Sequence, residues 1–327
     1  YTINDGFGGN ATATALVHSD ASGIASHGVS RIPLYVAHLR HGRVDGAAVA
    51  TIVGGKGAVR IVDAGNGFAF PACRLAVAEC IPLAREFGIG VSAVIHSNHF
   101  GAAAYPLDAA ARDGLIGIAL GNSPGAIAAW GGKTPLFGTN PIAAVFPRRH
   151  AAPLSIDLSL SKVARGKLLV AAQKGEPIPP DWALDPDGDP TTDPVQGLQG
   201  SMLPAGGIKG AMLALLVELL IGAVVGAGFA FEADSFFAET GNAANLGQMF
   251  LLLDPAAFSG SDAYLERVET LVAAVLSDAR TRLPGTRRKI NRDAAYTDGV
   301  VIPERLFSQL LTLAGRTPDT QPSEEQR

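Results

Sequence analysis

The strongest constraint on the fold is a regular alternation of apolar strands and helices in the first half of the chain. Runs of four to eight apolar residues between turn signals are typical of buried strands, and the longer segments between them are typical of helices. Such alternation predicts an α/β fold. The expected strands are 58–64, 91–96 and 115–120, and the expected helices between them are 70–88 and 102–114.

The alternation stops after residue 120. Apolar strands at 141–146 and 153–159 are joined by a short polar loop, which predicts an antiparallel hairpin and therefore a mixed sheet. A helix is expected at 162–175, ended by Gly175. The segment 176–194 is rich in proline, aspartate and glycine and predicts an irregular loop.

Further helices are expected near both ends of the chain, at 11–23, 30–44 and 261–280, and a further strand at 247–254. No low-complexity linker divides the sequence, so we expect one unit. The expected division is a single unit over 1–315, with a mixed-sheet lobe over 58–255, a mostly helical lobe over 1–57 and 256–315, and a polar tail over 316–327.

One segment, 210–231, has the length and apolar composition of a membrane span. It carries Glu218 near its middle and lacks flanking aromatic belts, which disfavours a span. We therefore expect a buried central helix and no membrane partner.

The composition describes a well-buried globular chain, with 47% apolar and 17% charged residues. A formal net charge of −4 disfavours a nucleic-acid partner, which would require a basic surface. The cysteines, Cys73 and Cys80, lie seven residues apart in an expected helix, too far for a disulfide. No signal-peptide pattern opens the sequence, and we expect a reducing cytoplasm.

A dinucleotide-binding fingerprint is the first functional test, and the sequence fails it. The stretch "VDAGNGFAF" follows a strand and opens a helix, and it contains Gly65 and Gly67. Its third glycine position is Phe70, and the next strand ends in His96 rather than an acidic residue. The Rossmann motif needs both features, so a Rossmann fold is not expected.

A metal site and an activated nucleophile are also disfavoured. His96 and His99 stand three apart in "IHSNHFG", but a zinc site needs three or four ligands, and the missing ones could come only from distant carboxylates. His38 and His41 repeat the spacing on an expected helix and are interpreted as surface residues. No GxSxG nucleophile elbow occurs. No metal is predicted.

Polar residues instead interrupt the apolar runs at the ends of the expected strands and the starts of the expected helices. Unpaired backbone amides at such positions are available to ligands. Reduction of a 2-oxo acid needs an arginine for the carboxylate, a histidine for the proton, and a cofactor that carries hydride. The segments that could supply these groups are "ASHGVSRI" (25–32), "SNHFG" (97–101), "LGNSPGA" (120–126), "FGTNP" (137–141), "IDLS" (156–159) and "AGGIKG" (205–210).

These residues resemble the type 2 malate/L-lactate dehydrogenase family, from about residue 12 to residue 310. The resemblance implies a non-Rossmann α/β fold with a mixed sheet flanked by helices and additional helical N- and C-terminal parts. It also implies an NAD or NADP cofactor and a homodimer. It rests on "SHGVSRIPLYV", "VDAGNGFAFPA", "SNHFGAAAYP", "FGTNPIAAVFP", "IDLSLSKVARGK", "DPDGDPTTDP" and "LPAGGIKGAMLALLVELL".

The resemblance also implies roles for single residues. His27 resembles the family's proton donor, with Ser26 as a relay, and His99 resembles the proton acceptor of the ureidoglycolate branch. Two candidates therefore stand for the acid/base role. Arg31 and Thr139 resemble substrate contacts. The residues that resemble cofactor contacts are Phe100, Gly101, Ala102, Ser123, Asp157, Leu158, Ser159 and Lys209.

The predicted function is hydride transfer between the nicotinamide and C2 of a small 2-hydroxy or 2-oxo acid. A reductase of cyclic imino acids is the alternative. That branch completes a charge relay near the position of Lys167, and lysine cannot accept a hydrogen bond from histidine. Against this, "GNGFAFPA" and "FGTNPIA" are similar to the imine branch. A non-catalytic protein that binds a cofactor or a partner is a third hypothesis. The choice between NAD and NADP stays open.

Overall fold

A mixed seven-stranded sheet forms the centre of the computed structural model, which describes residues 11–316. Only β2 and β3 pair in parallel, and the other neighbours are antiparallel. The predictions of an α/β fold with a mixed, non-Rossmann sheet and of the β7–β8 hairpin are therefore confirmed. In spatial order the strands are β1 (Thr51–Gly54), β2 (Val59–Asp63), β3 (Ile89–Ser97), β11 (Leu246–Leu253), β4 (Ile116–Gly121), β7 (Ile142–Phe146) and β8 (Leu154–Leu158).

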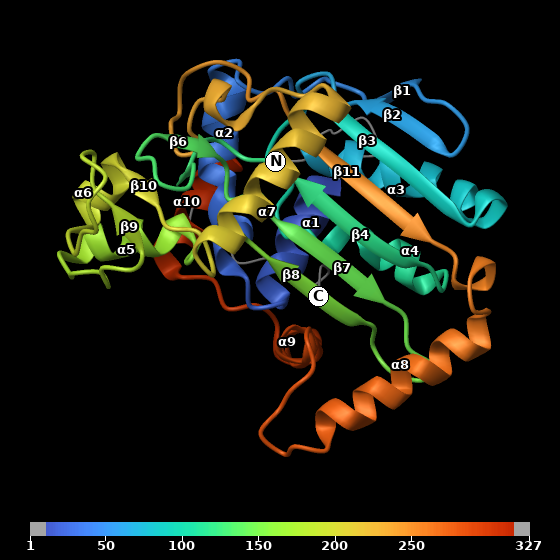
Figure 1. Cartoon of the computed structure of the whole chain (residues 1–327). Helices are drawn as coiled ribbons and strands as arrows, with labels where there is room; N and C mark the ends of the chain where they lie inside the picture. Colours follow the sequence, from blue (N-terminus) through green and yellow to red (C-terminus); the bar gives the residue numbers. More distant parts are fainter. Residues whose placement is uncertain (1–10, 317–327) are drawn as a thin grey trace.

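Strand β11 lies between β3 and β4, although more than a hundred residues separate it from either in sequence (Figure 1). Its alternating residues face opposite sides of the sheet. Phe250 and Leu252 are fully buried in the core beneath α3, while Met249 belongs to the apolar cluster beneath α7. The strand therefore ties both layers of helices to one sheet.

Helices cover both faces of this sheet. Helix α3 packs through alanines and both cysteines onto β2, β3 and β11, and Cys73 and Cys80 are free and buried, as predicted. Figure 1 shows α7 on the opposite face from α3 and α4. The helices of these layers are α3 (Ala69–Phe87), η3 (Tyr105–Leu107), α4 (Asp108–Arg112), α7 (Ile208–Glu218) and the π-helix η4 that continues it (Leu219–Val225).

The expectation that 210–231 is a buried central helix is wrong in part. Within the described residues, 208–225 has the length and composition of a membrane-spanning helix, and 39% of this window is buried. Ala214, Val217 and Ile221 are buried against the sheet, whereas Met212 and Leu216 are about half exposed. The helix therefore presents an apolar face to its surroundings.

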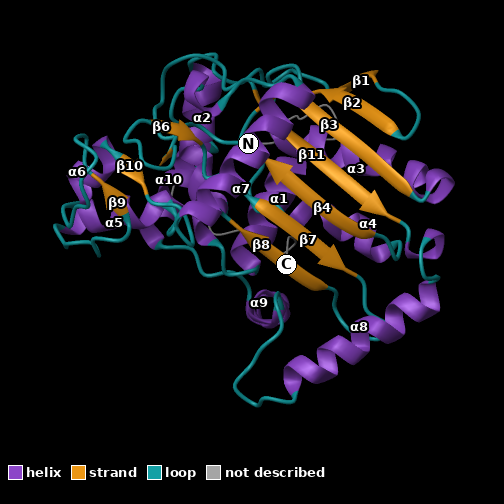
Figure 2. Ribbon diagram, viewed as in Figure 1, coloured by secondary structure: helices purple, strands orange, loops and turns teal. Residues whose placement is uncertain are grey.

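A second, four-stranded sheet lies beside the first and was not expected from the sequence (Figure 2). Its strands are short, so their apolar patterns are too brief to identify. The predicted helix 162–175 is present as α5, and the predicted loop 176–194 is irregular except for β9 and for Pro194, where α6 begins. The elements of this part are β5 (Ile127–Ala128), β6 (Pro135–Phe137), β9 (Ala183–Leu184), β10 (Ser201–Met202), α5 (Arg165–Lys174) and α6 (Pro194–Gln199).

Helices from the two ends of the chain pack together. Ile302, Leu306 and Leu310 contact the apolar cluster that includes Leu16 and Tyr35. The polar tail predicted at 316–327 lies outside the described residues except for Arg316. The remaining helices of the described residues are α1 (Ala11–Ala21), η1 (Ala25–His27), η2 (Val29–Arg31), α2 (Ile32–Arg40), η5 (Ala230–Glu232), η6 (Pro255–Ala257), α8 (Ser261–Leu276), α9 (Thr286–Asp298) and α10 (Glu304–Leu313).

Candidate active site

Two adjoining cavities, of about 130 and 260 Å³, lie at one edge of the large sheet. The strand directions explain their position: β3, β4 and β8 end at this edge, and β7 and β11 begin there. Polar residues that flank these five strands are therefore gathered although they are far apart in sequence. Residues that line both cavities are Ser26, His27, His99, Ser123, Thr139, Ser159, Ala164 and Phe236.

Nearly all of the predicted site residues are brought together. Arg31 lines the smaller cavity, and Asp157 lines the larger one together with Leu158. The predicted stretch Phe100, Gly101 and Ala102 also lines the larger cavity. Lys209 is the exception, because it lies in the first turn of α7 and lines neither cavity.

The two candidate histidines face each other. The rings of His27 and His99 are stacked with their centroids 5.3 Å apart. Nδ1 of His27 lies 2.9 Å from the hydroxyl of Ser26, and Nδ1 of His99 lies 2.6 Å from the hydroxyl of Tyr35. Each Nδ1 is thus engaged, and Nε2 is the nitrogen left for chemistry on both rings.

A buried glutamine of β11, Gln248, forms hydrogen bonds with the two residues that precede His99. Oε1 of Gln248 accepts a hydrogen bond from Ser97, and Nε2 of Gln248 donates to the carbonyl of Asn98. All three residues are buried. A fully satisfied buried network fixes the backbone position, so His99 stands on a rigid support.

Burial keeps both histidines neutral near pH 7. Burial, followed by the positive charges of Arg31 and Arg288, lowers the pKa of His27 to about 4. Burial, followed by Arg31, His27 and His38, lowers the pKa of His99 well below its ordinary value. A neutral imidazole is a proton acceptor, so either ring can take the hydroxyl proton of a 2-hydroxy acid.

Arg31 is placed to hold a carboxylate. Its Nε donates to the carbonyl of Ser26 at 2.7 Å, and its guanidinium lies over the ring of Phe237, 5.2 Å from the centroid. Among the described residues no acidic side chain forms a salt bridge with it. Its two terminal nitrogens are therefore available for a bidentate pair with an anion.

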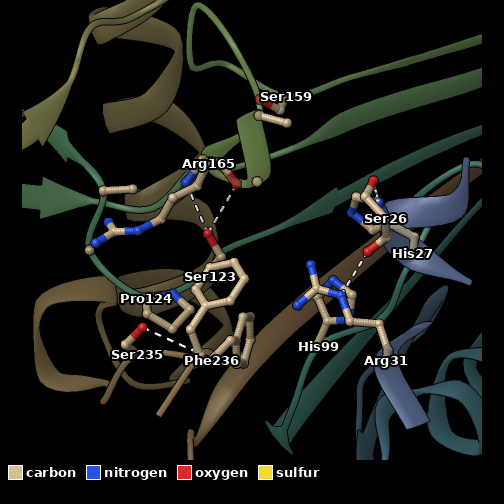
Figure 3. Close-up of a pocket in the computed structure, with 16 residues that line it drawn as sticks. Ser26, His27, Arg31, His99, Ser123, Pro124, Ser159, Arg165, Ser235 and Phe236 are labelled. Atoms are coloured by element: carbon tan, nitrogen blue, oxygen red, sulfur yellow. Dashed lines mark hydrogen bonds between the residues drawn. The ribbon is translucent and has the colours of Figure 1, made fainter. Parts of the chain in front are cut away.

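Ser123 lies across the smaller cavity from His27 and Arg31 (Figure 3), and Thr139 lines the same cavity. The hydroxyl of Ser123 accepts a hydrogen bond from the amide of Thr139 at 2.9 Å and lies 3.2 Å from its hydroxyl. This pair joins the segment after β4 to the segment before β7.

A buried carboxylate of α7 holds the same two segments. Oε2 of Glu218 accepts from Asn140 at 2.8 Å, and Oε1 accepts from Asn122 at 3.3 Å and from the amide of Ala230 at 2.6 Å. Asn122 precedes Ser123 and Asn140 follows Thr139. Glu218 therefore links α7 to the cavity wall.

The larger cavity has features that suit the pyrophosphate of a dinucleotide. The backbone amides of Phe100, Gly101 and Ala102 make no hydrogen bond with any other residue in the described part of the chain. Gly101 has φ +70°, and a Cβ there would lie 2.9 Å from the ring of Phe70. Unpaired amides and a nearby cation, Arg288, are a typical phosphate site. These amides and Arg288 therefore fit the pyrophosphate of a dinucleotide cofactor.

Asp157 and Arg288 form an ion pair at the rim of this cavity. Nη1 of Arg288 lies 3.5 Å from Oδ2 of Asp157, and Nη2 donates to its carbonyl at 3.0 Å. Burial raises the pKa of the Asp157 carboxyl, and Arg288 together with the amide of Ala104 opposes this rise. Arg288 comes from α9, near the end of the chain.

Three other histidines considered in the sequence lie outside these cavities. His96 has φ +48° and pairs with Asp63 at 2.9 Å. The expectation that His38 is a surface residue is wrong, because it is 2% exposed and lies beside Arg43. His41 is exposed. Residues 11–316 contain no group of three or more histidine, cysteine or acidic side chains that could hold a metal.

Sequence reasoning missed several residues of the site. Tyr35 follows Arg31 by four positions, and this helical spacing could have identified it. Arg165, Phe236 and Phe237 line the smaller cavity and gave no such signal. Lys167 lines neither cavity that contains the histidines. Its Nζ lies 5.4 Å from the ring centroid of Trp182, so the proposed relay position is occupied by a stacked cation.

Comparison with known proteins identifies relatives along nearly the whole chain. The model of a family described as malate/L-lactate dehydrogenase matches residues 9–311. A (2R)-3-sulfolactate dehydrogenase (NADP(+)) from Chromohalobacter salexigens is 49% identical over 93% of this chain and 90% of the relative. A Delta(1)-pyrroline-2-carboxylate reductase from Burkholderia ambifaria is 38% identical over 93% and 89%. The crystal structure of a delta1-piperideine-2-carboxylate reductase from Pseudomonas syringae superimposes with a TM-score of 0.87, at 35% identity, over 93% of this chain and 92% of that structure.

Proposed function

This chain belongs to the malate/L-lactate dehydrogenase family, and we propose that it oxidises and reduces a small 2-hydroxy/2-oxo acid pair with NADP. The observation that carries the proposal is one cavity that holds a carboxylate-binding arginine, Arg31, beside two neutral histidines, His27 and His99. NADP is preferred to NAD because the 49% identical relative is named for NADP(+).

The chemistry divides between cofactor and protein. A bound nicotinamide would supply the chemistry that no side chain can, namely acceptance of the hydride from C2 and its return in the reverse direction. Arg31 binds the carboxylate, and Thr139 contacts the substrate oxygen or carboxylate from the opposite wall. One of the two histidines takes the hydroxyl proton, so that C2–O becomes a carbonyl.

The remaining cavity residues would hold the cofactor. The amides of Phe100, Gly101 and Ala102 and the guanidinium of Arg288 suit its pyrophosphate. Ser159 and Asp157 lie at the end of β8 beside them. Phe236 and the walls of the smaller cavity exclude water from the reacting atoms, which strengthens the charged contacts.

Two relatives favour a second candidate, the reduction of cyclic imino acids. Both are named for pyrroline- or piperideine-2-carboxylate, whose carboxylate would suit Arg31 equally well. The test is a panel with NADPH and NADH that contains sulfopyruvate, oxaloacetate, pyruvate and Δ1-pyrroline-2-carboxylate. The proposal predicts the highest kcat/KM for a 2-oxo acid. A higher value for the imino acid would select the second candidate, and no oxidation of either cofactor would contradict both.

We also propose that the chain forms a homodimer through the exposed face of α7. Ile208, Met212 and Leu216 of α7 and Leu219, the first residue of η4, are spaced along one side of the continuous helix, and each is between 46% and 50% exposed. Such a contiguous apolar stripe is typical of an interface, and a two-fold axis would pair it with itself. The free, buried thiols of Cys73 and Cys80 support the reducing cytoplasm as its location.

A further inference from the structure

The loop 233–245, between η5 and β11, places two adjacent aromatic rings on the site. Phe236 meets the ring of His99 edge-on, with centroids 5.2 Å apart. Phe237 lies under the guanidinium of Arg31, 5.2 Å from its centroid. The loop therefore contacts His99, one of the two candidates for proton transfer, and Arg31, the proposed carboxylate-binding residue.

A buried arginine fixes the position of this loop. Arg43 is 2% exposed, and its guanidinium donates to the carbonyls of Asn242 at 3.1 Å, Ser235 at 3.0 Å and Asp234 at 3.2 Å. His38 adds a contact to the carbonyl of Ala238 at 2.9 Å. These hydrogen bonds join the backbone of the loop 233–245 to the end of α2 and the residues that follow it. They therefore fix the positions of the Phe236 and Phe237 rings.

Phe237 contributes to the lining of two cavities of different character. The first is the cavity of about 130 Å³ that contains the two histidines. The second is a cavity of about 880 Å³ with an apolar wall. Phe237 is 37% exposed and belongs to the lining of both. The apolar wall of the larger cavity comprises Leu34, Leu169, Val170, Ile178 and Trp182.

Resting on the proposed function, we propose that Phe237 determines substrate size by closing the reaction cavity against this larger apolar cavity. Arg31, which both cavities share, would keep the carboxylate in place while the ring blocks the path of a long side chain. Short 2-oxo acids fit in front of the ring. A 2-oxo acid with an unbranched chain of four or more further carbons would need the space that the ring occupies.

Replacing the ring by a small side chain would open this path. A long alkyl chain would then contact Leu34, Val170 and Trp182, and each methylene that enters an apolar pocket changes kcat/KM by about tenfold or more. The short substrates gain nothing from the opening, and they lose the support that the ring gives to the Arg31 guanidinium. The ratio of kcat/KM for long substrates to kcat/KM for short substrates should therefore rise.

The test compares kcat/KM for 2-oxooctanoate and pyruvate in the wild type, Phe237→Ala, Phe237→Leu and Phe231→Ala. We expect the ratio of long to short substrate to rise at least tenfold in Phe237→Ala and to change by less than about threefold in Phe237→Leu, which keeps most of the bulk. Phe231 is 56% exposed, stacks on Phe229 and lines neither cavity, so its variant is the matched control and should keep the wild-type ratio.

A binding measurement gives a second readout that does not need turnover. Trp182 lines the larger cavity, so 2-oxooctanoate should change tryptophan fluorescence in Phe237→Ala and pyruvate should not. If Phe237→Ala does not fold, Phe237→Val provides the same comparison. An unchanged ratio in an active, folded variant overturns the inference alone. A wild type that oxidises neither NADPH nor NADH with any 2-oxo acid overturns the proposed function and the inference together.

Discussion

The hydroxyl of Tyr35 lies 2.6 Å from Nδ1 of His99, and this hydrogen bond joins the helix that follows Arg31 to the turn that follows β3. Tyr35 is 3% exposed and packs against Phe68 and Phe70. Its ring cannot move without disturbing this aromatic cluster. The imidazole is thus held in one orientation, and Nε2 is the ring nitrogen that this hydrogen bond leaves unengaged.

Tyr35→Phe should lower kcat by about tenfold and leave KM within about threefold, because an orienting hydrogen bond is lost while the cavity keeps its shape. Steady-state kinetics with the preferred 2-hydroxy acid measures both constants. Tyr264→Phe is the matched control, since that hydroxyl donates to the carbonyl of Pro147 outside the site. An equal loss of kcat in both variants would contradict an orienting role for Tyr35.

Single glutamine variants should separate the roles of His27 and His99. The residue that moves the proton should lose about 10²- to 10⁴-fold in kcat, because general acid–base catalysis contributes that much. The other should mainly raise KM, since its ring only shapes the cavity. Single-turnover hydride transfer, followed by NADPH absorbance, measures the chemical step. If both variants keep the wild-type rate, neither histidine moves the proton.

The rate of 2-hydroxy acid oxidation should depend little on pH between 8 and 5.5. A base acts when it is neutral, and burial lowers the pKa of His27 to about 4 and that of His99 well below its usual value. The groups that face them are cationic or uncharged: Arg31 and Arg288 on one side, Tyr35 and His38 on the other. The fall in kcat/KM should therefore come below pH 5 if His27 is the base, and well below 6.5 if His99 is the base. A descending limb centred at 6.5 would mean that the proton acceptor is a solvated histidine.

Glu218→Gln should destabilise the fold by about 2 to 3 kcal/mol, because one oxygen that accepts hydrogen bonds becomes a buried NH₂ group facing other donors. The carboxylate accepts hydrogen bonds from Asn122, Asn140 and the amide of Ala230. Urea unfolding measures the loss. Glu266→Gln, on the exposed side of α8, is the control and should change the free energy of unfolding by less than about 0.5 kcal/mol. A stability equal to the wild type would show that the network contributes no net energy.

The sequence predicted most of the site because strand ends carry local signals. Apolar runs that stop at "SNHFG", "LGNSPGA" and "FGTNP" predicted where β3, β4 and β7 end or begin, and the polar residues there meet at one edge of the sheet. The position of β11 was not predictable, because its pairing with β3 and β4 depends on contacts across more than a hundred residues.

The residues that were missed depend on such long-range contacts. Phe237 reaches Arg31, and Arg288 reaches Asp157, from segments that carry no local motif. His38 was assigned to the surface because it shares an expected helix with His41 and no acidic residue stands beside it, but the loop 233–245 covers it. The segment that forms α7 is apolar enough for a membrane span. Hydropathy alone does not tell whether such a helix is buried in a core or exposes an apolar face.

That face gives the last prediction, Leu216→Glu. Leu216 is 50% exposed in the single chain. In the proposed interface the glutamate of one subunit would face the same glutamate of the other subunit across the two-fold axis, with no cation between them. Burying such a charge should weaken the dimer by about a hundredfold or more in Kd, because an unpaired buried charge costs several kcal/mol. Analytical ultracentrifugation of the wild type and the variant measures the change. Leu276→Glu, at the exposed end of α8 and 48% exposed, is the control and should leave the dimer intact. A monomeric wild type, or a variant whose Kd is unchanged, would contradict the proposed interface.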